Sequence, residues 1–144
     1  DDRLHVVSNR AIPDICLEHL LALALVDGGL TFASSHDDAR MHDPAVLAVR
    51  KRITAKPSAE LTSAKPARQA IIDITLKGGR TVSRRTRAVL GTPDNPMSRG
   101  DIEAKALDLM APVLGPARAR PLSEALGTAE RIDDIRALRP LLVA

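Results

Sequence analysis

The stretch PDICLEHLLALALVDGG, residues 13–29, limits the fold more than any other part of the chain, because it is apolar almost throughout. At about 100° per residue, a helix here has two apolar faces. One face carries an i, i+3, i+4, i+7, i+8 stripe of Leu17, Leu20, Leu21, Ala24 and Leu25. The other carries Cys16, His19, Leu23 and Val26. Since a helix that is apolar all round is buried all round, we expect the leucine stripe to pack on the chain's own core. The His19 face would then contact a second layer that need not belong to this chain.

The sequence also predicts where this helix begins and ends. Asp14 suits the N-cap, since its carboxylate can accept a hydrogen bond from the free amides of the first turn. Gly28 and Gly29 are stop signals, because glycine adopts the left-handed cap without steric cost. The run is too short and too interrupted to cross a bilayer, which needs about 20 apolar residues. We therefore expect a helix over 14–27 and no membrane partner.

Length and composition predict one domain, 1–144, and exclude some partners. Phe32 is the only aromatic residue, so the core must be built from Leu, Ile, Val and Ala. The net charge is only +3, and the basic stretch SRRTR, 83–87, has no aromatic residues for stacking bases, so we expect no nucleic-acid partner. The single cysteine, Cys16, excludes an internal disulfide, and we see no signal peptide, so we expect a cytoplasmic protein.

The clearest element after residue 29 is a hairpin. Ile72, Ile74 and Leu76 alternate with polar residues, the period-two pattern of a strand. Gly78-Gly79 suits a two-residue turn, and residues 80–90 return as the partner strand. Shorter strands are predicted over 4–7 and 53–55. The whole order predicts an α+β fold, in which a small antiparallel sheet with a β-hairpin packs against several helices.

Further helices are predicted on both sides of the hairpin. One covers residues 43–52, with Asp43 as its cap and proline next. After a proline-rich linker, 91–96, Ser98 and Asp101 resemble a capping box. The next helix would end at Pro112 and Gly115 and turn inward a stripe of Ile102, Ala106, Leu109, Met110 and Val113. Another helix follows around Leu122, and the last, 132–142, would turn Ile132, Ile135 and Leu138 inward.

The segment SSHDDARMHD, 34–43, is rich in potential metal ligands. Asp38 and His42 are four residues apart and share a helix face. A metal site usually needs about three or four converging ligands with a supporting second shell, and the spacing here matches no standard pattern. We therefore expect no metal, and interpret the segment as a polar loop whose Asp43 caps a helix.

His19 is the most informative single candidate, and two interpretations stay open. It is a hydrogen-bonded, inert core histidine, or it is a site residue at a domain interface that donates a hydrogen bond or moves a proton near neutral pH.

Four blocks of the chain, in order, resemble the C-terminal part of the MmgE/PrpD family. They are HLLALALVDGG (19–29), DPAVLAVRKRI (43–53), IDITLKGGRTV (72–82) and GTPDNPMSRGDIEAKALDLMAPVLG (91–115). The order and spacing match from about residue 4 to residue 142, and the most specific parts are G-x-P-x-N-P and APVLG.

This resemblance implies a cofactor-independent lyase or isomerase. The family includes 2-methylcitrate dehydratase, cis-aconitate decarboxylase and iminodisuccinate epimerase, which remove a proton next to a carboxylate of small polycarboxylates. Its subunits are commonly dimers, with the active site in a cleft between a large helical domain and a smaller α/β domain. The chain resembles only the smaller domain, so we expect the N-terminal helical domain and a Lys- and His-containing segment to be absent, and the isolated chain to be inactive.

The resemblance also suggests site residues. The family position that matches His19, eight residues before Asp27, is often Tyr and approaches the cleft. His19 is therefore the catalytic candidate, as a hydrogen-bond donor to a substrate carboxylate, and His36 is a substrate-binding candidate. The alternative is a non-catalytic interaction or regulatory module whose apolar face binds another protein.

Overall fold

The computed structural model of the protein describes residues 10–143, and the strand predicted over 4–7 lies outside them. The chain divides into two compact units, Asp1–Pro96 and Met97–Ala144. Their boundary falls at the end of the predicted linker, where an isolated bridge pairs Thr92 with Asn95. The single domain over 1–144 stays a prediction, because two compact units can belong to one domain. Each unit is described by itself.

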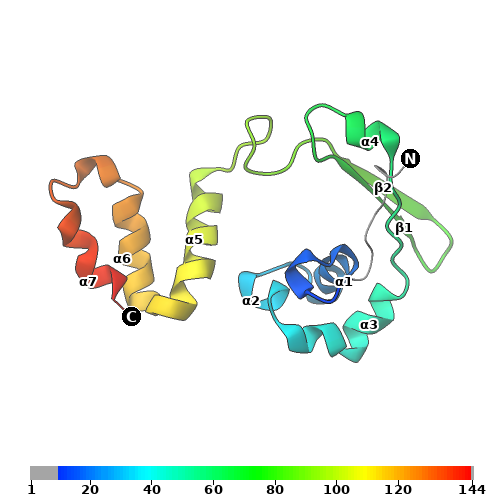
Figure 1. The fold of residues 1–144 in the computed structure, drawn as a ribbon, viewed down its shortest axis with the longest axis horizontal. Helices are drawn as coiled ribbons and strands as arrows, with labels where there is room; N and C mark the ends of the chain where they lie inside the picture. Colours follow the sequence, from blue (N-terminus) through cyan, green and yellow to red (C-terminus); the bar gives the residue numbers. More distant parts are fainter. Residues whose placement is uncertain (1–9, 144) are drawn as a thin grey trace. The chain divides into compact units, whose positions relative to one another are not determined.

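The first unit contains a group of short helices and a hairpin (Figure 1). The helices are α1 (Leu17–Asp27), α2 (Phe32–Ser35), α3 (Pro44–Arg50) and α4 (Ala59–Ser63), with 3-10 turns at Pro13–Ile15 and Asp38–His42. α1 packs on α3, and the small core between them consists of Ala22, Leu23 and Val46. Val49 and Ile53 pack against it. The core is aliphatic, as the composition requires.

The buried face of α1 is the one that carries His19, so our assignment of the two faces was wrong. Cys16, His19 and Leu23 are fully buried, whereas Leu17 and Leu25 of the leucine stripe are 52% and 56% exposed. Periodicity locates two apolar faces but does not say which one the rest of the chain covers. That choice is made by α3, which packs on the His19 face.

The limits of α1 agree with the prediction at one end only. The helix begins at Leu17 rather than Asp14, because Pro13–Ile15 form a separate 3-10 turn and an extended Cys16 takes the N-cap. Asp14 therefore caps nothing in this helix. The C-terminal end is confirmed, since Gly28 has φ 78°, in the left-handed region where glycine carries no steric penalty.

The hairpin and the α+β class are confirmed. β1 (Ala70–Thr75) and β2 (Thr81–Thr86) are antiparallel, and Ile74 lies opposite Val82. All residues of both strands are exposed, so the expected packing of the hairpin on helices is not observed. Its apolar residues have no covering layer among the residues that the structure describes.

One polar contact ties the hairpin to α4. Arg85 on β2 donates to Glu60 Oε1 over 2.7 Å and to Gln69 Oε1 over 2.8 and 3.0 Å. Arg85 thus belongs to a local network on one face of the hairpin, which fixes where α4 lies beside the strands.

Residues 53–55, predicted as a strand, are irregular. A strand requires a hydrogen-bonded neighbour, and the described sheet contains β1 and β2 alone. Ile53 packs instead against the core between α1 and α3.

The second unit is helical, with α5 (Arg99–Leu114), α6 (Pro116–Leu126), α7 (Arg139–Leu142) and 3-10 turns at Ala129–Arg131 and Ile135–Leu138. The capping box at its start is confirmed: Asp101 N–H donates to Ser98 Oγ over 3.1 Å, and Ser98 N–H donates to Asp101 Oδ2 over 2.9 Å. α5 continues through Pro112 and stops at Leu114, before Gly115 with φ 74°.

The core of this unit contains Ala119, Leu122 and Leu138. The predicted inward stripe of α5 was wrong in part. Ala106 and Met110 are partly buried, but Ile102, Leu109 and Val113 are exposed. The predicted last helix is a 3-10 turn followed by α7, and its Ile135 is 67% exposed. Within residues 10–143, no helix has the length and apolarity needed to cross a bilayer.

Candidate functional site

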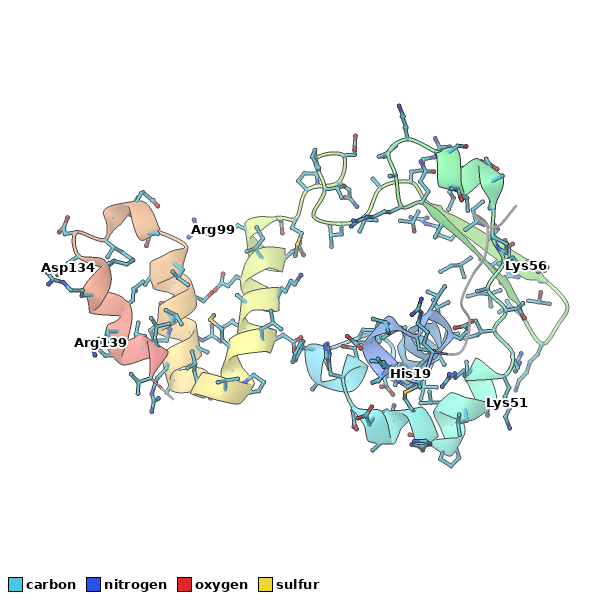
Figure 2. All side chains as sticks on the ribbon, viewed as in Figure 1. His19, Lys51, Lys56, Arg99, Asp134 and Arg139 are labelled. Carbon is cyan, nitrogen blue, oxygen red and sulfur yellow. The ribbon has the colours of Figure 1, made fainter. Side chains whose placement is uncertain are left out.

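His19 lies on the face of α1 that packs on α3 (Figure 2). Its side chain is completely buried, and neither ring nitrogen has a hydrogen-bond partner among the described residues. Most buried polar groups in native proteins are hydrogen-bonded. Among the described residues, His19 is thus buried as the core interpretation expects, but without the hydrogen bond that this interpretation includes.

The electrostatic surroundings of His19 favour a neutral ring. Burial lowers its pKa from the ordinary value of 6.5, and the charges of Arg50 and Arg40 lower it further. A neutral imidazole keeps one donor and one acceptor nitrogen. His19 can therefore accept a proton or donate a hydrogen bond, but only to a group that reaches the interior.

Two other polar side chains are buried close to His19 in the sequence. The Cys16 thiol donates to Glu18 Oε2 over 3.8 Å, a weak contact, and both residues are buried. A buried thiol behaves as a small apolar group rather than as an exposed nucleophile. The start of α1 thus buries a thiol, a carboxylate and an imidazole within four residues of sequence.

His36 is in a different environment. It is exposed at the C-terminal end of α2, and its Nδ1 lies 2.9 Å from the Phe32 carbonyl oxygen. Because a carbonyl oxygen only accepts, Nδ1 carries the proton in this contact. The rings of Phe32 and His36 stack with centroids 4.0 Å apart. Nε2 lies 3.8 Å from Asp14 Oδ2, so this side of the ring faces the Asp14 carboxylate.

The structure does not join the two histidines predicted from sequence. His19 is enclosed under α3, whereas His36 is exposed and held by α2 and Asp14. Within residues 10–143, no hydrogen bond or ion pair links them.

The polar segment 34–43 serves local structure. Asp37 accepts a hydrogen bond from Ala39 N–H over 2.9 Å, and Asp43 accepts one from Ala45 N–H over 2.8 Å as the N-cap of α3. Arg40 donates to both Asp27 and Asp43. Among the described residues, no group of three or more ligand-type side chains is arranged to hold a metal ion. Sequence reasoning missed Arg40, because its partner Asp27 is distant in the chain.

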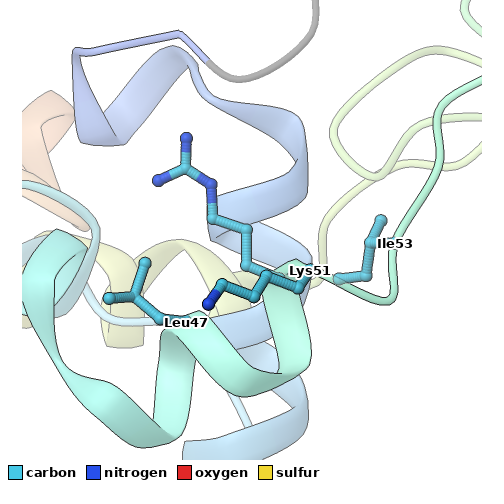
Figure 3. Close-up of a pocket in the computed structure, with 4 residues that line it drawn as sticks. Leu47, Lys51 and Ile53 are labelled. Atoms are coloured by element: carbon cyan, nitrogen blue, oxygen red, sulfur yellow. The ribbon is translucent and has the colours of Figure 1, made fainter.

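An open pocket of about 280 Å³ lies at the C-terminal end of α3 (Figure 3). Leu47, Arg50, Lys51 and Ile53 line it. The basic run of Arg50, Lys51 and Arg52 was the signal in the sequence, but only the fold shows that two of these cations border a pocket with apolar walls.

Comparison with known families decides which proteins this chain resembles. The family model described as the MmgE/PrpD C-terminal domain matches residues 5–130. The chain belongs to the MmgE/PrpD family. The resemblance inferred from the four sequence blocks is thereby confirmed, including its restriction to the C-terminal domain. A comparison with curated proteins found no match.

The MmgE/PrpD domain match includes every candidate residue discussed above. His19, His36 and the pocket at the end of α3 all lie inside residues 5–130. MmgE/PrpD proteins are generally enzymes of the lyase or dehydratase type. The match does not extend over residues 131–143, which contain the 3-10 turn at Ile135–Leu138 and α7.

Proposed function

We propose that the chain is the smaller domain of a cofactor-independent MmgE/PrpD lyase or isomerase that acts on small polycarboxylates, with 2-methylcitrate dehydratase as the nearest type of activity. The observation that carries this proposal is the family match over residues 5–130. In the dehydratase reaction, a base removes the proton next to a carboxylate, and the neighbouring hydroxyl group leaves with a proton as water.

The exposed apolar faces of the first unit support a larger enzyme. Leu17 and Leu25 on α1, and Ile72, Ile74 and Val82 on the hairpin, are large apolar residues exposed to solvent. Contiguous exposed apolar surface usually marks an interface. We propose that a helical domain covers these faces and that the complete subunit forms a homodimer in the cytoplasm.

The two histidines take different parts in this proposal. His36 is exposed at the C-terminal end of α2, so a substrate carboxylate can reach it from the surface. His19 is enclosed, and it can donate to a substrate only when the packing of α3 on α1 opens. We therefore place His36 at the substrate and keep His19 as the catalytic candidate that depends on this opening.

The test is a turnover assay on the native full-length polypeptide, purified from its source. It would be incubated with 2-methylcitrate and related dicarboxylates and tricarboxylates in D₂O, with a chelator present. Proton NMR would follow both the exchange of the proton next to the carboxylate and the appearance of an alkene. We expect exchange without added metal. If none of these acids gives either exchange or product, the proposal is overturned.

The second candidate is a non-catalytic interaction module, which the same exposed apolar faces favour. An antibody against this chain, used on a denaturing gel of source cells, separates the two. A band much larger than that of a 144-residue chain supports the enzyme. A band of this size favours the module.

A further inference from the structure

We propose that the pocket formed by Leu47, Arg50, Lys51 and Ile53 binds a small organic anion with two or more carboxylate groups. The pocket is distinct from both candidate histidines, and sequence reasoning assigned it no role. The choice of a polycarboxylate rests on the proposed function, whereas the pocket and its charge stand on the geometry alone.

The shape of the pocket suits a metabolite-sized ligand. Its volume of about 280 Å³ is just below the range of about 300–1,000 Å³ for small-molecule sites. Leu47 and Ile53 lie on either side of Lys51 (Figure 3). They offer apolar contact to the carbon skeleton of a ligand, while Arg50 and Lys51 add two cationic side chains to the lining. Arg50 Nη2 also donates a hydrogen bond to the Arg10 carbonyl oxygen over 3.4 Å. Arg binds carboxylates through a planar, two-pronged donor set, and Lys acts as a point charge.

The sequence around the pocket is rich in positive charge. Residues 44–59 contain Arg50, Lys51, Arg52 and Lys56 but no Asp or Glu. Of the ion pairs that join side chains within residues 10–143, none includes Lys51, Arg52 or Lys56. After burial, the charge of Arg50 is the next cause that lowers the pKa of His19. Clefts lined by one sign of charge concentrate ions of the opposite sign.

A simpler explanation accounts for part of this pattern. Cations in the last turn of a helix interact favourably with its carbonyl end, and Arg50 and Lys51 are at the end of α3. That explanation predicts that removing Lys51 affects the stability of α3. It does not predict apolar walls beside the two cations. Ligand binding and stability must therefore be measured separately.

The experiment is calorimetric titration of the 144-residue chain at low salt with acetate, succinate and citrate, with inorganic phosphate as the comparison anion. We expect affinity to rise with the number of carboxylates and to fall as salt is added. The informative variant is Lys51→Glu. Its matched control is Lys77→Glu, which makes the same change of charge at the hairpin turn, away from the pocket in the sequence. Circular dichroism and urea unfolding would show whether each variant folds.

Lys51→Glu is expected to weaken citrate binding about tenfold or more, whereas Lys77→Glu leaves it unchanged. If Lys51→Glu does not fold, Lys51→Gln replaces it, with Lys77→Gln as control. A second readout is the His19 ring in NMR. An anion beside Arg50 reduces the positive field, so citrate should raise the pKa of His19 in the wild-type chain and in the Lys77 variant.

Equal citrate affinity in the Lys51 and Lys77 variants would overturn the inference, and so would a phosphate affinity equal to that of citrate. These outcomes are separable from those of the turnover assay. Citrate binding that depends on Lys51, without turnover, supports the pocket while the proposed reaction fails. Turnover without such binding leaves the reaction standing and removes the pocket.

Discussion

Arg40 donates to the carboxylate of Asp27, the last residue of α1, over 2.5 Å and also to Asp43, the N-cap of α3. The same guanidinium therefore joins the end of α1 to the start of α3. Asp43 meanwhile uses its other oxygen, Oδ1, to accept from Ala45 N–H. The segment 28–42, which contains α2, is closed by this shared arginine.

Replacing Arg40 with alanine should lower the stability of the first unit. Both carboxylates lose their charged donor, and the pKa of Arg40, which Asp27 raises by accepting its hydrogen bond, shows that the folded state favours this cation. We expect a lower urea midpoint with an unchanged m-value. Arg40→Lys keeps the charge but can contact only one carboxylate closely, so its urea midpoint should lie between those of wild type and Arg40→Ala. An unchanged midpoint for Arg40→Ala would show that the contact contributes nothing.

Replacing His19 separates packing from chemistry. His19→Leu keeps a similar volume and removes two buried nitrogens without partners, so we expect the free energy of unfolding to rise by about 1 kcal/mol. His19→Ala leaves a cavity and should lower the same quantity by about 2 kcal/mol. Urea unfolding of both variants is the measurement. A large loss of stability in His19→Leu would mean that the imidazole is hydrogen-bonded after all.

His19→Leu also tests how acid affects the stability of the folded chain. Burial, with the charges of Arg50 and Arg40, lowers the pKa of His19 in the folded chain, while the unfolded chain keeps a value of about 6.5. Between these two values the unfolded chain binds more protons than the folded one. The part of the free energy of unfolding that depends on the protonation of His19 is therefore fully present above about pH 6.5. It is lost as the pH falls toward the folded-state pKa. Between acid and neutral pH, the free energy of unfolding should rise more steeply with pH in wild type than in His19→Leu. Parallel curves of this free energy against pH would contradict the prediction.

The end of α1 offers a test with its own control. Gly28 has φ 78°, and a Cβ placed there would meet nothing within 4 Å, so an alanine suffers from backbone conformation alone. We expect Gly28→Ala to cost about 1 kcal/mol. Gly29→Ala occupies equally open space without a left-handed φ and should be close to neutral. Equal effects of the two substitutions on thermal unfolding would contradict the claim that the left-handed conformation of Gly28 requires glycine.

Local rules predicted the elements whose stability is local. The hairpin follows from alternation around Ile74 and from the glycine turn, and Asp43 and Ser98 were identified as N-caps from residue type and spacing alone. These features depend on residues a few positions apart, so an isolated sequence contains all the information that they need.

The wrong predictions concern residues whose burial depends on packing between segments that are distant in the sequence. α1 has two apolar faces, and only the position of α3 determines that His19 is covered while Leu17 is exposed. On α5, Ile102 and Val113 were expected inside because they are apolar, yet the described residues leave them exposed. The site has the same limit, because Arg40 meets Asp27 only in the folded chain.

The contact between Phe32 and His36 has a spectroscopic consequence. Phe32 is the only aromatic residue of the sequence, and its ring centroid lies 4.0 Å from that of His36. A phenyl ring shifts the resonances of nuclei above and below its plane, and no tryptophan or tyrosine in this chain adds a similar effect. The ring protons of His36 should therefore carry an upfield shift that belongs to this one contact. A change in that signal when substrates or partners are added would report directly on the end of α2.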